Sequence, residues 1–164
     1  MIYFITYNDD MFDSDLYFKA TIEDAVNYCK NKQILAVDTE TTGLNFVRDS
    51  MTMFQIGDDT HQYVIDVREC PLELFRDILE SPDIIKIFHN AKFDLNFIRK
   101  HCNIKCQNVY DTMLAEKVIN CGKELSNSLK NTVKRYLNIE LDKNVQSSFI
   151  GGINKRFTSS QIVY

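Results

Sequence analysis

The sequence has no excess of positive charge, no long apolar run and no repeated or low-complexity segment. Its 19 lysine and arginine residues stand against 23 aspartate and glutamate residues, which gives a net charge of −4. Proteins that coat a nucleic-acid backbone are normally basic, so we expect any nucleic-acid contact to be local and assisted by metal ions. No apolar stretch reaches the roughly 18 residues that span a bilayer, and the first residues lack the basic start of a secretory signal. We therefore expect no membrane partner.

The cysteines form no C-x-x-C pair, and their number, five, is odd. Cys102 and Cys106 lie close together in the sequence next to His101, which leaves a zinc site open as one interpretation. Free, mostly buried thiols in a reducing compartment are the favoured alternative. On that basis we expect a cytoplasmic location.

What the sequence does contain is typical of one soluble globular domain. Hydrophobic residues make up 45% of the 164 residues and charged residues 26%, which are ordinary fractions for a domain with a real core. We expect a single domain over residues 1–164.

Short runs rich in β-branched and aromatic residues predict strands. They lie at residues 2–6, 33–40, 51–58, 62–67, 84–89 and 108–111. Between them, apolar residues at helical spacing predict helices, and residues suited to caps precede them. The predicted helix starts lie at Thr21, Pro71, Asn90, Asp111 and Thr158 or Ser159, and a further helix is expected over 125–137. Residues 143–156 are polar and contain two adjacent glycines, which predicts a loop. This order favours an α/β fold with a mixed central β-sheet flanked by helices.

The stretch "AVDTETTGL" at residues 36–44 carries the first unusual chemistry. Asp38 and Glu40 are two positions apart, so on a strand both carboxylates point to the same face. Like charges held side by side repel, and a cation between them would relieve that repulsion. Hard carboxylate oxygens suit Mg²⁺ or Mn²⁺. The alternative is a strand end with two solvated acids.

A second polar group occurs in "HNAKFDLNFI" at residues 89–98. Asn90 and Asp94 are four positions apart, so they share one face of the predicted helix. Asp94 borders the apolar stripe instead of lying opposite to it. An acid at that border often has a partner, and a metal ion is one candidate.

Five segments in this order resemble the 3′–5′ exonuclease domain of family A DNA polymerases and its relative ribonuclease D. They are "DTETTGL", "HNAKFDLNFI", "YDTMLAEKVI", "SLKNTVKRYLNIELDK" and "RFTSSQIVY". The resemblance covers Gln33 to Tyr164 and implies membership of the DEDD superfamily, with a ribonuclease H-like fold.

The resemblance also implies roles for individual residues. Asp38 would bridge two divalent metal ions, Mg²⁺ or Mn²⁺, while Glu40 would bind one ion and Asp94 the other. Tyr164 would orient the attacking water, which places the sequence in the tyrosine branch of the superfamily. On the substrate side, the corresponding positions are Leu44, which would pack on the terminal base, and Thr41 and Asn90.

The expected function is therefore metal-dependent removal of nucleotides from a single-stranded DNA 3′ end, as in polymerase proofreading. RNA 3′ processing like that of ribonuclease D shares every motif, and a non-catalytic module that binds a strand end or a partner domain is the third possibility. The third family motif is Y-x-x-x-D, so its acid would fall four positions after Tyr164, the last residue. We expect a domain truncated within its last helix, with little nuclease activity in these 164 residues, and a polymerase domain attached in the full-length protein.

Overall fold

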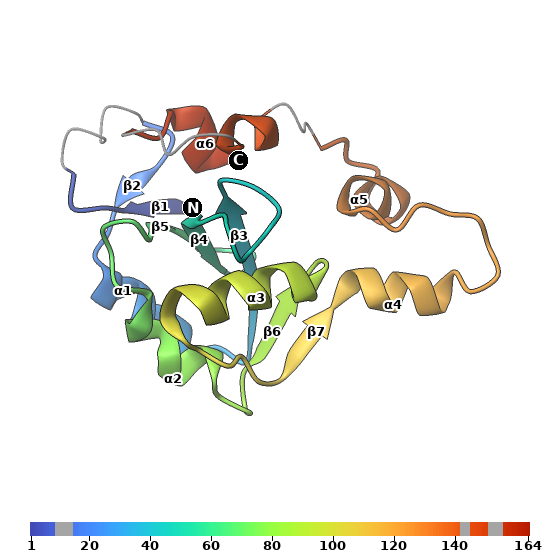
Figure 1. The fold of residues 1–164 in the computed structure, drawn as a ribbon, viewed down its shortest axis with the longest axis horizontal. Helices are drawn as coiled ribbons and strands as arrows, with labels where there is room; N and C mark the ends of the chain where they lie inside the picture. Colours follow the sequence, from blue (N-terminus) through green and yellow to red (C-terminus); the bar gives the residue numbers. More distant parts are fainter. Residues whose placement is uncertain (9–14, 142–144, 151–155) are drawn as a thin grey trace.

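A seven-stranded mixed sheet runs through the middle of the computed structural model, which describes residues 1–8, 15–141, 145–150 and 156–164 (Figure 1). The strands are β1 (Ile2–Ile5), β2 (Phe18–Lys19), β3 (Ile34–Thr41), β4 (Met51–Gly57), β5 (Gln62–Asp66), β6 (Ile85–Phe88) and β7 (Val109–Asp111). Their order in the sheet is β2-β1-β5-β4-β3-β6-β7, and β4 is antiparallel to both neighbours while the other pairs are parallel. The six predicted strands are confirmed, and β2, two exposed residues long, gave no signal in the sequence.

Helices α1 (Ile22–Lys30), α2 (Arg76–Leu79) and α3 (Ala91–Cys102) cover one face of the sheet, together with the 3₁₀ helix η2 (Leu72–Phe75). The main core lies between them and the alternate strand residues of that face, such as Leu35, Val37 and Phe54. The predicted start of α1 is confirmed, because Thr21 and Asp24 form a reciprocal capping box. The predicted α/β fold is therefore confirmed, with helices built on the expected apolar stripes.

A smaller second core occupies the opposite face of the sheet. Phe4, Met53 and Val64 point to this face, and Phe149 and Ile162 from the C-terminal part of the chain pack on them. Phe149 belongs to η3 (Gln146–Phe149) and Ile162 to α6 (Ser159–Val163). The prediction of a loop over 143–156 is therefore wrong for residues 146–149, because Phe149 gains burial against the sheet; residues 143, 144 and 151–155 lie outside the described part.

Helices α4 (Thr112–Ile119) and α5 (Leu129–Leu137) project away from the sheet (Figure 1). No residue of α5 is buried, and Glu116 is the buried residue of α4. The predicted helix over 125–137 begins four residues later, at Leu129 behind its Ser128 cap. Tyr136, on α5, is 56% exposed.

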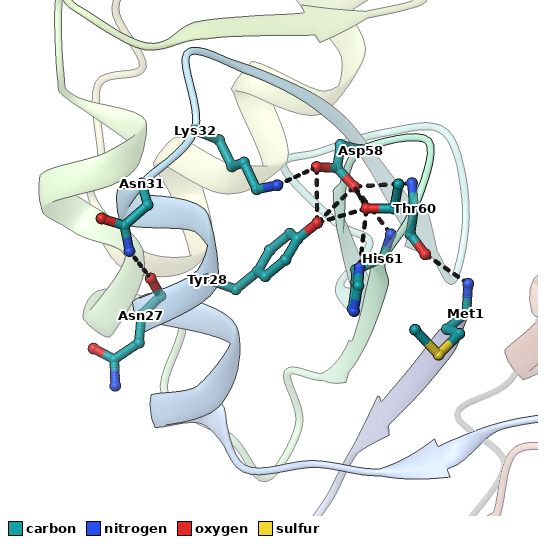
Figure 2. A network of polar contacts seen from close by, with 8 residues as sticks. All are labelled: Met1, Asn27, Tyr28, Asn31, Lys32, Asp58, Thr60 and His61. Carbon is teal, nitrogen blue, oxygen red and sulfur yellow. Dashed lines mark hydrogen bonds and ion pairs between the residues drawn. The ribbon is translucent and has the colours of Figure 1, made fainter.

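A polar cluster ties the β4–β5 turn to α1 (Figure 2). Asp58 forms an ion pair of 2.7 Å with Lys32 and accepts a hydrogen bond from the Tyr28 hydroxyl. Although burial acts in the opposite direction, hydrogen bonds from Lys32 and from the His61 and Thr60 amides hold the pKa of Asp58 well below its ordinary value. The cluster fixes the end of the sheet that lies away from the C-terminal end of β3.

The cysteines agree with the expectation of free, mostly buried thiols. All five cysteines are free thiols; Cys29, Cys70 and Cys102 are buried, Cys106 is half-buried and Cys121 is exposed. Within the described residues, no helix combines the length and apolar character that crossing a membrane requires.

Candidate functional site

Asp38 and Glu40 lie at the end of β3 on the face of the second core. In the antiparallel pair with β4, Glu40 is directly opposite Met53, and side chains of opposite residues share a face. Met53 belongs to the second core, so Asp38 and Glu40 also point to that side. The pairing register shifts between Glu40 and Thr41, which ends the regular strand just after the two acids. The alternation predicted from the sequence is confirmed.

Asp94 approaches the same strand end from helix α3. It lies in the first turn of this helix and is only 2% exposed. Its Oδ1 atom accepts a hydrogen bond of 2.7 Å from the Thr39 hydroxyl. Thr39 sits between Asp38 and Glu40 in the sequence, so this bond attaches the helix to the segment of β3 that bears the two acids. Thr39 was not identified from the sequence, because a threonine in a strand carries no distinctive signal.

The three carboxylates are close enough for their negative charges to shift one another's pKa. Burial, followed by the charges of Asp38 and Asp94, raises the pKa of Glu40 to about 8. Burial and then the charge of Asp38 raise the pKa of Asp94, and burial raises that of Asp38. Asp38 is open to the solvent of a pocket, but protein surrounds its carboxylate on most sides. The arrangement therefore disfavours three negative charges in the absence of a compensating cation.

The donor set suits a hard divalent cation, since it consists of carboxylate oxygens that repel one another. In the part of the chain that the structure describes, however, no three His, Cys, Asp or Glu side chains are grouped so that they could hold a metal ion. The assignment of Asp38, Glu40 and Asp94 as metal ligands stays a prediction.

An open pocket of about 590 Å³ lies over Asp38. Its lining includes Asp38, His89 and Gln55 from the sheet side and Tyr164 from the C-terminal end. Tyr164 is held there because Ile162, two residues earlier, is buried in the second core. The structure thus brings Asp38 and Tyr164, 126 positions apart in the sequence, to the same pocket. Another pocket, of about 430 Å³ between α1 and the η2–α2 segment, contains none of the predicted site residues.

A smaller pocket of about 220 Å³ joins two of the predicted substrate residues, Leu44 and Asn90. The rings of Phe46 and Phe93 contribute to its lining, and neither was singled out from the sequence. Leu44 is 79% exposed, which leaves it open to contact with a ligand. His89 lines the larger pocket and Asn90 the smaller one, so this short stretch of the chain contributes a residue to each pocket.

Asn90 does not cap α3 with its side chain, which corrects the prediction from the sequence. Its backbone has φ 69° and ψ 48°, in the left-handed region, and its side chain makes no capping hydrogen bond. The carboxylate of Asp111 instead accepts hydrogen bonds from the backbone N–H groups of Asn90, at 3.0 Å, and Ala91, at 2.9 Å. The Asn90 side chain is therefore not used as a cap.

Thr41 is buried, and its hydroxyl donates a hydrogen bond of 2.7 Å to the carbonyl oxygen of Gly43. This bond shapes the turn that presents Leu44. The Lys100 ammonium, from the last turns of α3, donates to the carbonyl oxygen of Asp49 at 2.8 Å and so holds the far side of the same loop. The placement of Thr41 favours support of the turn, and its predicted contact with substrate stays a prediction.

Comparison with known proteins identifies the relatives of this chain. A family model described as a 3′–5′ exonuclease matches residues 17–164. DNA polymerase I of Aquifex aeolicus is 32% identical over 128 residues, which are 77% of this chain and 20% of the polymerase. Ribonuclease D of Zymomonas mobilis is 31% identical over 127 residues, 76% of this chain and 32% of the ribonuclease. The chain thus spans a third or less of these relatives.

Solved structures give the same fold. The catalytic core of RRP6 from Trypanosoma brucei matches 100% of this chain and 42% of its own, with a TM-score of 0.80 and 20% identity. Escherichia coli RNase D matches 98% of this chain and 40% of its own, with a TM-score of 0.77 and 21% identity. The predicted ribonuclease H-like fold and the resemblance to the DEDD superfamily are confirmed.

Proposed function

Because the chain belongs to the 3′–5′ exonuclease family, we propose that it removes nucleotides from the 3′ end of single-stranded DNA with two divalent metal ions, Mg²⁺ or Mn²⁺. The main support for the proposal is that Asp38 and Tyr164 line a single pocket. The negative charges of Asp38 and Asp94 also raise the pKa of Glu40, so the three acids lie near one another. Polymerase proofreading is the favoured setting, because DNA polymerase I is among the most similar relatives.

In this proposal Asp38, Glu40 and Asp94 hold the ions, because their carboxylate oxygens repel one another until a cation is present. Two ions held there would supply an activated water and would stabilise the leaving 3′ oxygen in an in-line displacement. The Tyr164 hydroxyl, which lines the same pocket as Asp38, would orient the attacking water. Neutralisation by metal ions also explains how a protein with a net charge of −4 binds a phosphate chain.

The smaller pocket, lined by Leu44 and Asn90, is assigned to the terminal nucleotide. Leu44 is exposed at its rim and offers an apolar surface to a base, and the Phe46 and Phe93 rings supply flat surfaces beside it. Base stacking on aromatic rings is worth about 1–3 kcal/mol per base and tolerates any sequence. The Asn90 side chain, free of a capping role, is available to hydrogen-bond the nucleotide.

RNA is the second candidate substrate. Ribonuclease D is 31% identical to the chain, and exosome complex component 10 of Homo sapiens is 29% identical over 118 residues. Because the matched segment makes up 20% of the Aquifex polymerase, the proposal for DNA includes a covalently attached polymerase domain as partner in a longer protein. The RNA alternative has no such partner.

The test uses 5′-labelled single strands of identical sequence, one all-DNA and one all-RNA, with the protein in excess so that a single slow cleavage is visible. We expect slow, stepwise shortening of the DNA strand from its 3′ end, in line with the low activity expected of these 164 residues, and faster shortening of DNA than of RNA. EDTA and a 3′-phosphate on the strand should each suppress it. Asp38→Asn should abolish it, while the exposed and remote Asp83→Asn serves as the matched control.

Four results would contradict the proposal. Hydrolysis that persists in EDTA would remove the metal ions from the chemistry. Cleavage of a circular single strand would show an endonuclease instead. Metal-dependent binding of a strand end without any shortening would leave the non-catalytic module as the better description, and faster shortening of RNA would favour 3′ RNA processing.

A further inference from the structure

The turn between β6 and α3 is held by two residues that lie about twenty positions later in the sequence. It consists of Phe88, His89, Asn90 and Ala91, and every one of these four residues is bonded to Asp111 or Thr112. The same turn contributes His89 to the larger pocket and Asn90 to the smaller one, and Asp94 follows it in the first turn of α3. Any movement of the turn therefore moves a wall of both pockets and one of the three acids.

Asp111 supports this turn through its carboxylate. The two oxygens accept from the N–H groups of Asn90 and Ala91, and Oδ1 also accepts from those of Met113 and Leu114 at the start of α4. One side chain thus caps two helices at once. The two α3 bonds also stabilise Asn90 in a left-handed conformation, which a non-glycine residue adopts at a cost.

Thr112 supplies a second pair of bonds. Its hydroxyl donates to the carbonyl oxygen of Phe88 at 3.0 Å and lies 2.9 Å from Nδ1 of His89. A hydroxyl has one hydrogen, and here it points at Phe88, so Nδ1 of His89 must carry a hydrogen and donate to Thr112. This contact fixes the ring orientation of a residue that lines the pocket over Asp38.

We propose that Asp111 and Thr112 are positioning residues of the exonuclease site: together they fix the turn Phe88–Ala91 and so set the places of Asn90 and Asp94. The inference rests on the proposed function. Neither residue touches the substrate in this assignment. Asp111 acts through the backbone of Asn90 and Ala91, and Thr112 acts through Phe88 and the ring of His89.

Substitution by serine separates the two roles of Asp111. Serine is a good N-cap for α4, but its single short hydroxyl cannot also satisfy the Asn90 and Ala91 amides across the turn. Asp111→Ser should therefore leave α4 capped and release the turn. Thr112→Val keeps the shape of the side chain and removes both of its hydrogen bonds. The matched control is Thr21→Ala, which removes the cap of α1, a helix remote from both pockets.

Two measurements on the full 164-residue chain test the proposal. Amide hydrogen exchange of the segment 88–94 should accelerate at least about 10-fold in Asp111→Ser and Thr112→Val, because the hydrogen bonds that protect it are lost. Single-turnover hydrolysis of the DNA strand, well below the unfolding temperature, should show the maximal rate reduced about 10- to 100-fold per folded molecule, as displacements of about 1 Å at a catalytic site do. Thr21→Ala should change neither quantity.

The outcomes are separable. Unchanged exchange of 88–94 in Asp111→Ser would overturn the proposal whatever the activity. Accelerated exchange with a parental maximal rate would show that these residues support the fold without positioning the site, which also overturns it. If the parent chain fails to hydrolyse any strand, the proposed function fails, and the exchange experiment then decides by itself whether Asp111 and Thr112 hold the turn.

Discussion

Replacing Glu40 by glutamine should stabilise the metal-free protein, and the gain should appear only as the pH rises. Glu40 is 6% exposed, and its ionised form is disfavoured by burial and by the charges of Asp38 and Asp94. Its pKa is raised from an ordinary value of 4.5 to about 8 in the folded chain. At about 1.4 kcal/mol per pH unit, that difference costs the ionised folded state about 5 kcal/mol.

The sign follows from proton binding. A carboxyl whose pKa is raised on folding binds more protons in the folded than in the unfolded state. The contribution of Glu40 to the stability of the folded state is therefore most favourable below pH 4.5, and it is lost as the pH rises to about 8. Glutamine does not titrate, although its buried amide still has to be desolvated at a cost of about 1–3 kcal/mol. We therefore expect Glu40→Gln to be more stable than the parent by about 2–4 kcal/mol above about pH 8, and less stable by about 1–3 kcal/mol below about pH 4.5, where the parental carboxyl is uncharged.

The assay is urea unfolding followed by circular dichroism, in EDTA, at both pH values. Asp83→Asn is the control, because Asp83 is exposed and distant from the acids, and it should show no such pH dependence. Mg²⁺ or Mn²⁺ should raise the stability of the parent at high pH and so reduce the stability difference between Glu40→Gln and the parent. A Glu40→Gln variant that is less stable than the parent at high pH in EDTA would refute the account of mutual repulsion.

Three further results are expected. Asp38→Ala should lower single-turnover hydrolysis of the DNA strand more than Tyr164→Phe does, because the loss of an orienting hydroxyl costs at most about 10²–10⁴-fold; equal rates for Asp38→Ala and the parent would contradict the assigned chemistry. Phe157→Ala removes a ring that packs against the second core and lies 4.0 Å from the Arg68 guanidinium. It should lower the free energy of unfolding, measured by urea titration, by about 2 kcal/mol. Hydrolysis should also fall, because the second core holds the segment that ends at Tyr164. A thiol reagent should modify the exposed Cys121 and leave Cys29 unmodified, because Cys29 is buried and burial raises its pKa to about 12. Peptide mass spectrometry measures the labelling of each cysteine, and rapid labelling of Cys29 in the native protein would contradict a closed main core.

Local patterns in the sequence were sufficient for the sheet and for part of the site. The run that forms β3 alternates exposed and buried residues over its first part, while β4 is buried almost throughout, so the position of both strands and the shared face of Asp38 and Glu40 could be predicted. The start of α1 was equally local, because Thr21 and Asp24 bond to each other.

The parts that the sequence did not reveal depend on contacts between distant segments. Asn90 is a good N-cap by propensity, but Asp111, 21 positions away, binds the amides of Asn90 and Ala91 instead. Phe149 lies in a polar stretch that resembles a loop, and only the sheet beneath it explains its burial. Helix α5 has an apolar stripe at Leu129, Val133 and Leu137, yet none of its residues is buried.

The second core has a consequence for how the protein responds to heat. The sheet carries an extensive core under α1–α3 and a small one on the opposite face, where Phe149 and Ile162 attach the C-terminal segment. Units with few buried contacts open at a lower free energy than the whole domain does. The wall that bears Tyr164 should therefore detach at temperatures at which the sheet is still intact. Activity would then fade well before the melting transition and return on cooling, since strand β3 and helix α3, which carry the three acids, stay folded at those temperatures.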